Sequence, residues 1–124
     1  MFALLEHTTR DGIHWDFIVE VPGRETLPTW RLLQNPLVHQ DVIEAVSIAA
    51  HDRRFLDYEG PLREGGGRVR RLDRGDAEVE QFDEQRVVAR LDGERLRCRI
   101  ELSREAELTF LFRRIEDADR GAST

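Results

Sequence analysis

The stretch HTTRDGIHWDFIVEV, residues 7–21, carries the clearest strand pattern in the chain. Successive side chains of an extended strand point to opposite faces. Trp15 and Phe17 therefore face one side of the stretch, while His14 and Asp16 face the other. The alternation predicts a strand over residues 14–21 that holds an imidazole and a carboxylate side by side on its polar face.

A turn precedes this strand and suggests a metal site. Residues 8–12 (TTRDG) are turn-forming and would fold His7 back toward His14. Two histidines and an aspartate on paired strands form half of an octahedral site, which leaves room for water and a substrate oxygen. A His-x-Asp pair alone is more often a solvated polar strand face. The position of His7 favours His7, His14 and Asp16 as metal ligands.

The remaining pattern predicts short strands separated by turns. The run at 45–50 is compatible with strand or helix, and we prefer strand. Spacing of turn signals every 8–12 residues indicates an all-β fold, a small closed or nearly closed β-barrel of about eight strands with little helix. Its polar strand faces would then line a mouth or lumen. The strand candidates are 2–7, 14–21, 27–33, 45–50, 68–72, 77–82, 86–91, 95–102 and 107–115.

Length and composition bound the class of protein. The 124 residues are enough for one domain, which we place at 1–115, with a flexible C-terminal tail at 116–124. All 19 basic residues are arginine, so no lysine is available as a nucleophile. The net charge of −6 argues against non-specific coating of nucleic acid. A basic island at 53–74, with 7 arginines and 4 acids, is suited to local capture of an anion.

Cysteine content and hydropathy suggest a cytoplasmic protein. Cys98 is the single cysteine, so no disulfide can form within the chain, and a reducing compartment is expected. Its alternation with Leu96 and Ile100 predicts a small buried residue. The N-terminus MFALLEH is too short for a signal peptide, and no apolar run approaches the ~20 residues that span a bilayer. We expect no membrane association.

A second polar cluster follows the run at 45–50. Residues 51–60 (HDRRFLDYEG) contain His51, Arg53 and Arg54 among three acids. A charged surface loop is the plain interpretation; the functional one is that His51 and an arginine face the metal and hold an anion. Backbone N–H groups of the glycine run at 65–67 could add contacts to phosphate. The charged face of 95–102 is more simply a solvent face.

Taken together, these stretches resemble the 3′-phosphoesterase domain associated with bacterial DNA ligase D and its small stand-alone relatives. The motifs occur in the order of that family over roughly residues 2–75. They are His7, HWDF at 14–17, TW at 29–30, His51, LDYEG at 56–60, GGG at 65–67 and LDRG at 72–75.

The resemblance implies a function and a site. It implies a β-barrel with Mn²⁺, or another divalent metal, held by His7, His14 and Asp16, and a catalytic role for His51, which would contact the scissile phosphate, and for His14. The family's reaction removes a terminal ribonucleotide or phosphate from the 3′ end of DNA or of an RNA–DNA primer during repair. Separately encoded ligase or end-binding repair proteins would be its partners.

Three positions differ from the family pattern and leave two alternatives open. Ile18, Gln34 and Phe55 stand where the family commonly has arginine, lysine and tyrosine. We expect phosphate contacts from His51, Arg53, Arg54 and Arg10, with Arg31 as a further candidate. One alternative is a catalytically weakened barrel that binds nucleic-acid ends or a repair partner without turnover. The other is an esterase for a small phosphate ester.

Overall fold

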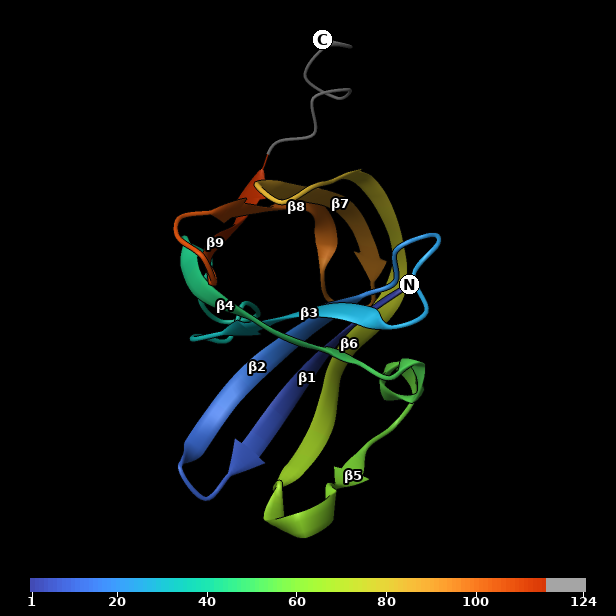
Figure 1. Ribbon diagram of the computed structural model, residues 1–124, viewed down its shortest axis with the longest axis vertical. Coiled ribbons are helices and arrows are strands. Elements are labelled where there is room, and N and C mark those ends of the chain that lie inside the picture. Colours follow the sequence, from blue (N-terminus) through green and yellow to red (C-terminus); the bar gives the residue numbers. More distant parts are fainter. Residues whose placement is uncertain (116–124) are drawn as a thin grey trace, which may run out of the picture.

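Strands β1 (Phe2–Thr9) and β2 (Gly12–Val19) form the hairpin that the opening stretch predicts. Their two-residue connection, residues 10–11, sets a register in which His7 lies opposite His14. This hairpin belongs to a computed structural model that describes residues 1–115, drawn in Figure 1. The tail predicted at 116–124 lies outside the described residues.

The described residues form an antiparallel sheet closed on itself (Figure 1). Its strands follow the order β1-β2-β3-β4-β9-β8-β7-β6, and β6 pairs again with β1. This ring of eight strands, with β5 added beside β6, confirms the predicted all-β, nearly closed barrel. The further elements are β3 (Leu27–Leu32), β4 (Ile43–His51), η1 (Arg53–Leu56), β5 (Gly60–Pro61), η2 (Arg63–Gly65), β6 (Arg68–Phe82), β7 (Arg86–Gly93), β8 (Arg97–Arg104) and β9 (Thr109–Ile115). Among residues 1–115 no helix has the length and apolar character needed to cross a membrane.

The prediction of separate strands at 68–72 and 77–82 is wrong, because β6 runs unbroken through the LDRG motif. The first half of β6 pairs with β1 and the second half with β7. Asp73 lies at the crossover, 4% exposed, and its carboxylate accepts hydrogen bonds from the backbone N–H groups of Glu94 and Leu96 at 2.9 and 2.7 Å. A polar residue that resembles a turn signal in the sequence therefore anchors the β7–β8 loop and helps to close the barrel.

Two glycines permit the close approach of β6 and β7. Gly75 lies opposite Gly93, and a Cβ atom added to Gly75 would lie 2.1 Å from the Asp92 carbonyl oxygen. A Cβ atom on Gly93 would lie 2.5 Å from the Asp73 carboxylate. Neither position has room for a side chain, so the glycine of the LDRG motif is explained by packing.

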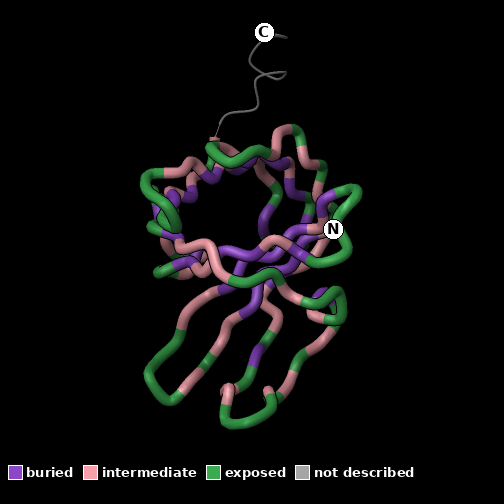
Figure 2. Tube along the Cα trace, in the orientation of Figure 1, coloured by how far each residue is buried: buried purple, intermediate pink, exposed green. Residues whose placement is uncertain are grey.

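The residues that face the barrel interior are apolar, and Figure 2 shows buried residues (purple) along the strands of the ring. It is filled by one cluster contributed by strands from around the ring, with Phe2, Phe17, Trp30 and Phe112 among its larger members. The expected polar mouth or lumen does not receive the polar face of the early strands. Because residues alternate along β2, the face that carries His14 and Asp16 points out of the barrel. A second apolar cluster covers part of that outer face: Ala3, Leu5, Ile18, Leu27, Leu56 and Val69.

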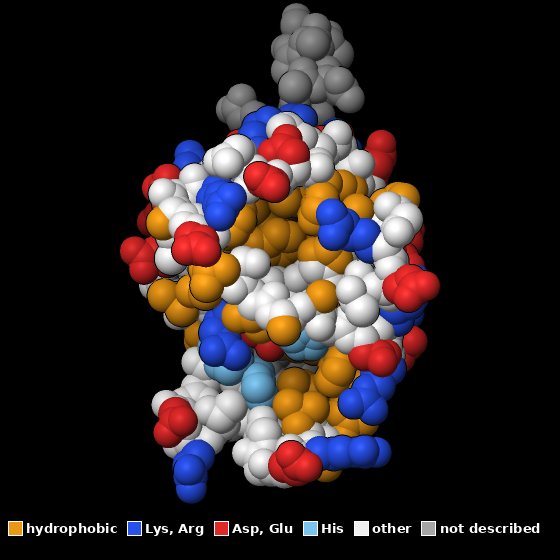
Figure 3. All heavy atoms as spheres, viewed as in Figure 1, with side chains coloured by type: hydrophobic (Ala, Val, Ile, Leu, Met, Phe, Trp, Pro, Cys, Tyr) orange, Lys and Arg blue, Asp and Glu red, His pale blue; other side chains and the backbone are white. Residues whose placement is uncertain are grey.

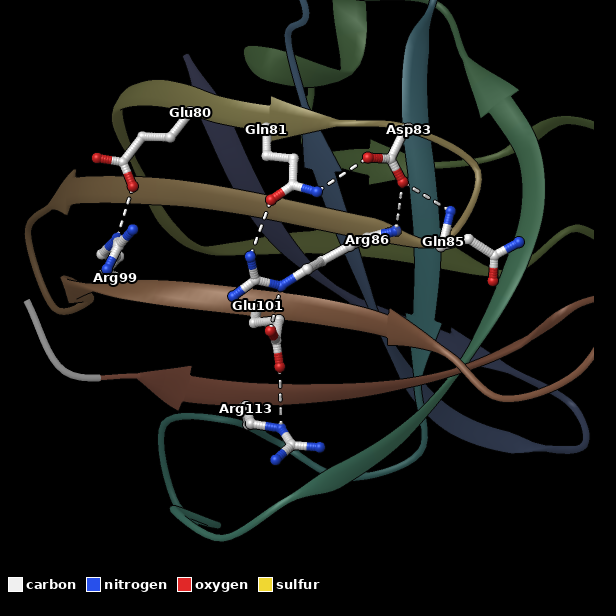
Figure 4. Close-up of polar contacts among 8 residues, drawn as sticks. All are labelled: Glu80, Gln81, Asp83, Gln85, Arg86, Arg99, Glu101 and Arg113. Carbon is white, nitrogen blue, oxygen red and sulfur yellow. Dashed lines mark hydrogen bonds and ion pairs between the residues drawn. The ribbon is translucent and has the colours of Figure 1, made fainter. Parts of the chain in front are cut away.

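The charged face of β8 is used for ion pairs between strands (Figure 4). Arg99 contacts Glu80 at 2.5 Å, while Glu101 contacts both Arg86 and Arg113. Such pairs on a half-exposed face add modest stability. They agree with the plain interpretation of residues 95–102 as a solvent face. Cys98, on the opposite side of β8, is half-buried.

Candidate metal centre

Asp16 is the centre of the polar cluster on the outer face of the barrel. It lies in β2 between Leu5 of β1 and Arg31 of β3, and it is only 2% exposed. The segment from η1 to η2 contributes Leu56 and Leu62 to the apolar cluster beside it. In Figure 3 the pale-blue histidine atoms gather below β3 and β4, next to a patch of hydrophobic side chains. The sheet and this covering segment together keep the carboxylate away from bulk water.

Three histidines surround this carboxylate. His7 Nδ1 lies 3.8 Å from Asp16 Oδ2, and His14 Nε2 lies 3.6 Å from Oδ1. His51 Nε2, from the end of β4, lies 3.8 Å from Oδ2. One ligand atom from each of His7, His14 and Asp16 falls within 4.8 Å of the others. The structure thus brings together the three proposed metal ligands and places His51 on the same carboxylate.

The orientation of His7 is fixed by the glycine run. His7 Nε2 lies 2.6 Å from the Gly66 carbonyl oxygen, an acceptor, so Nε2 carries the ring proton. The other ring nitrogen, Nδ1, lies 2.8 Å from His14 Nε2. Metal-binding histidines usually donate their other N–H to such a carbonyl. Gly66 therefore supports His7 through its carbonyl group, whereas its N–H is hydrogen-bonded to the Arg63 carbonyl oxygen at 3.0 Å.

Thr29 fixes the orientation of His51. The Thr29 hydroxyl donates to the Leu27 carbonyl oxygen at 2.9 Å, and its oxygen lies 2.9 Å from His51 Nδ1. Since the hydroxyl has a single hydrogen, its oxygen accepts from His51 Nδ1–H. The unprotonated Nε2 of His51 is the atom that faces Asp16.

Burial changes the proton affinity of these groups. Burial is the main cause that lowers the pKa of His14 to about 4, and the electrostatic effects of Arg31 and His7 act in the same direction. Burial also lowers the pKa of His51, against the opposing effect of the Asp16 carboxylate. The pKa of Asp16 is raised by burial, despite the nearby His51, His7 and Arg31. At neutral pH the rings of His14 and His51 are therefore neutral and keep a lone pair for a metal or a proton.

The donor set fits a divalent transition metal. Asp16 Oδ1 is buried and has no hydrogen-bond partner in the described structure, an expensive arrangement for a carboxylate. Two imidazole nitrogens and one carboxylate oxygen suit Mn²⁺, Fe²⁺ or Zn²⁺ more than Ca²⁺. His7, His14 and Asp16 would hold the ion, which would also satisfy Oδ1.

The arginines proposed for phosphate binding do not gather at this cluster. Arg53 forms an ion pair with Glu20. Arg54 lies over the rings of Phe55 and Tyr58, with its guanidinium carbon 5.0 and 5.8 Å from their centroids. Arg10 is exposed in the β1–β2 turn.

Arg31 does reach the cluster. Its Nε lies 4.0 Å from Asp16 Oδ1, and it lines a cavity of about 500 Å³ together with His7, His14 and Gly66. Thr29 and the Gly66 carbonyl are the supporting groups that sequence reasoning missed. The sequence signal available for Thr29 was its position directly before the tryptophan of the TW motif.

None of the three departures from the family pattern presents a polar group to the cluster. Ile18 is fully buried in the second apolar cluster. Phe55 packs edge-on against His51, with ring centroids 5.1 Å apart. Gln34 is exposed, and its amide nitrogen lies 3.3 Å from His39 Nδ1.

The comparison with known families covers most of the chain. The profile of the DNA Ligase D 3′-phosphoesterase domain matches residues 5–104. The match extends past the motifs recognised up to Gly75 and includes all of β7 and β8. No curated protein matches the chain. The chain belongs to the DNA Ligase D 3′-phosphoesterase domain family.

Proposed function

We propose that this protein is a metal-dependent 3′-phosphoesterase that removes a terminal phosphate from DNA ends during repair. The observation that carries the proposal is the convergence of His7, His14 and Asp16, whose central carboxylate has an oxygen without a hydrogen-bond partner in the described structure. Membership of the 3′-phosphoesterase family supports the reaction class and the action on 3′ ends.

The reaction is hydrolysis of a phosphate monoester. A bond forms between a water oxygen and phosphorus, the bond from phosphorus to the 3′ oxygen breaks, and that oxygen leaves as a hydroxyl after gaining a proton. A divalent cation at the His7–His14–Asp16 cluster would neutralise phosphate charge and activate water. Manganese is the ion that we propose, because imidazole and carboxylate ligands are compatible with it and the family resemblance implies it.

The protein groups have separate tasks. Asp16 supplies the negative charge that attracts the cation, and His7 is held by Gly66 with Nδ1 toward the cluster. We assign proton movement to His51 Nε2, because Thr29 keeps the other ring nitrogen protonated. An approaching phosphate favours protonation of Nε2, which can then donate a hydrogen bond to a phosphate oxygen. Phosphate roles for Arg53, Arg54 and Arg10 would require their side chains to leave the positions described above.

Calorimetric titration with Mn²⁺ tests the metal site. Wild-type protein is compared with Asp16→Ala, and both are then assayed on a primer–template that ends in a 3′-phosphate. We expect metal binding and phosphate release in the wild type and neither in the variant. Asp76→Ala, an exposed aspartate on the second half of β6, is the matched control and should behave as the wild type. A wild type that binds no Mn²⁺ would show that the cluster is only a polar strand face.

A second function is favoured by a specific observation. Ile18, Gln34 and Phe55 offer no polar group to the cavity beside the cluster, so fewer groups grip the phosphate than the family pattern implies. A barrel that binds 3′-phosphorylated ends or a repair partner without turnover is the alternative. Saturable binding of that primer–template with Mn²⁺ present, and no phosphate released across several pH values, would favour it over the enzyme. The third candidate is an esterase for a small phosphate ester. Measuring the turnover of such an ester and of the DNA end under the same conditions distinguishes it from the first two.

A further inference from the structure

Arg31 lies where a substrate phosphate and the candidate metal would meet. It lines the cavity of about 500 Å³ that His7, His14 and Gly66 also line. We propose that Arg31 is the phosphate anchor of the site and makes it selective for a phosphate monoester over a diester. The proposal rests on the proposed function and adds a specificity-determining residue to it.

The backbone places Arg31 directly beside the central carboxylate. Arg31 of β3 is the cross-strand partner of Asp16 of β2. Its Nε is buried, has no hydrogen-bond partner in the described structure and lies 4.0 Å from Asp16 Oδ1. The side chain as a whole is 39% exposed. Arg31 thus lies beside the site with its Nε buried, while an anion in solution can still reach the rest of the side chain.

Neighbouring arginines have local partners that do not belong to the cluster. Arg70 contacts Glu6 at 3.3 Å, and Arg71 contacts Glu59 at 3.8 Å. Among the described residues the acidic partner of Arg31 is Asp16. That carboxylate is also the proposed metal ligand. Once it binds a cation, its charge is shared, and the Arg31 guanidinium needs another anion.

Charge balance indicates which anion this is. Histidine binds a metal ion as the neutral ring and aspartate binds it as the carboxylate, so with the ion in place the charges of Asp16 and Arg31 cancel and the site keeps the two positive charges of the cation. A terminal phosphate monoester carries up to two negative charges and balances the site, whereas a diester carries one. The planar guanidinium can also donate two parallel hydrogen bonds to phosphate oxygens. The removal of Arg31 should therefore weaken binding of a monoester more than binding of a diester.

If Arg31 is a phosphate anchor, its removal should weaken the binding of phosphate but not the binding of the metal. Its positive charge repels a cation at Asp16, so Arg31→Gln should leave Mn²⁺ affinity unchanged or tighten it. A merely structural role, in which Arg31 holds Asp16 in place, predicts that Mn²⁺ and phosphate affinity fall together. The sign of the change in metal affinity therefore separates anchoring from support.

The experiment measures binding, not turnover. Calorimetry gives the affinity of Mn²⁺ for the wild type, Arg31→Gln and Arg31→Lys, and then the affinity of each Mn²⁺-loaded protein for inorganic phosphate and for dimethyl phosphate at pH 8. Inorganic phosphate stands for the doubly charged monoester, and dimethyl phosphate stands for the diester. Arg97→Gln, which removes an exposed arginine of β8, is the matched control. Circular dichroism checks that each variant folds. If Arg31→Gln does not fold, Arg31→Lys takes its place in the comparison.

We expect Arg31→Gln to lose roughly tenfold to a hundredfold in phosphate affinity and less than about threefold in dimethyl phosphate affinity. Arg31→Lys should be intermediate, and Arg97→Gln should match the wild type. Unchanged phosphate affinity in Arg31→Gln, equal losses for both anions, or a parallel loss of Mn²⁺ affinity would overturn the proposal while the proposed function stands. A wild type that binds no Mn²⁺ overturns the proposed function, and this proposal with it.

Discussion

His7 and His14 lie opposite each other on β1 and β2, and their ring nitrogens Nδ1 and Nε2 are 2.8 Å apart. The short turn at residues 10–11 sets this register, and a slip by one residue would turn one of the rings into the barrel. The geometry of the candidate metal centre therefore depends on the hairpin connection as well as on the ligands.

Asp16→Asn should separate metal binding from stability. Burial raises the pKa of Asp16, which means that folding disfavours its charged form, so a neutral amide of the same shape should not destabilise the metal-free protein. Wild-type protein should gain about 2.7 kcal/mol of unfolding free energy at a Mn²⁺ concentration one hundred times its Kd, and the variant should gain none. Urea unfolding with and without Mn²⁺ measures both effects. A metal-free variant that is markedly less stable than wild type would contradict this account of Asp16.

Thr29→Val should impair the positioning of His51 while the metal ligands stay intact. The substitution removes the oxygen that accepts from His51 Nδ1–H and leaves that N–H without its partner. We expect roughly a tenfold lower kcat, with Mn²⁺ affinity unchanged and the pH profile of kcat displaced. Thr29→Ser restores the hydroxyl and should recover most of the activity. Equal kcat and pH profile in Thr29→Val and wild type would show that the hydroxyl does not position His51.

The stability of the metal-free protein should fall as the pH drops below 6.5. The pKa of His14 is about 4 in the folded protein against 6.5 for the unfolded side chain. Between these values the unfolded chain binds the proton and the folded chain does not, so protonation favours unfolding. Urea unfolding at pH 7 and pH 5 measures the decrease, which His14→Gln should reduce. NMR titration of the imidazole gives the folded pKa directly, and a value near 6.5 would refute the prediction.

Asp73→Ala should destabilise the barrel without affecting the metal site. Asp73 accepts hydrogen bonds from backbone N–H groups of the β7–β8 loop, and its removal leaves these donors, including the buried Leu96 N–H, without their partner. A loss of about 3 kcal/mol is expected from the size of such terms. Chemical denaturation gives the value, with exposed Asp76→Ala as a control that should change stability by less than about 0.5 kcal/mol. A similarly small change in unfolding free energy in both variants would show that Asp73 does not stabilise the β7–β8 loop.

The local sequence pattern was sufficient for much of the fold and for the proximity of the three proposed metal ligands. The alternation after His14 placed β2, and the turn residues placed His7 opposite His14, because strand periodicity and turn chemistry act over a few residues. The pattern misassigned Asp73, since its partners lie more than twenty residues away in the β7–β8 loop. The pattern also could not decide which arginine would contact a phosphate: Arg10, Arg31, Arg53 or Arg54. That choice depends on cross-strand pairing and on which arginine has another local partner.

Because the face that carries His14 and Asp16 points outward, it determines the size of molecule that can reach the cluster. An eight-stranded barrel has an interior just wide enough to be filled by side chains, and this one is packed with Phe2, Phe17, Trp30 and their neighbours. A reactive cluster in such a bore would admit only a small molecule. A cluster on the outer face of the barrel is reached directly from solvent. The end of a long polymer can therefore approach it while the rest of the polymer remains in solvent. The architecture therefore sets no upper limit on the length of a polymer whose end could reach the cluster.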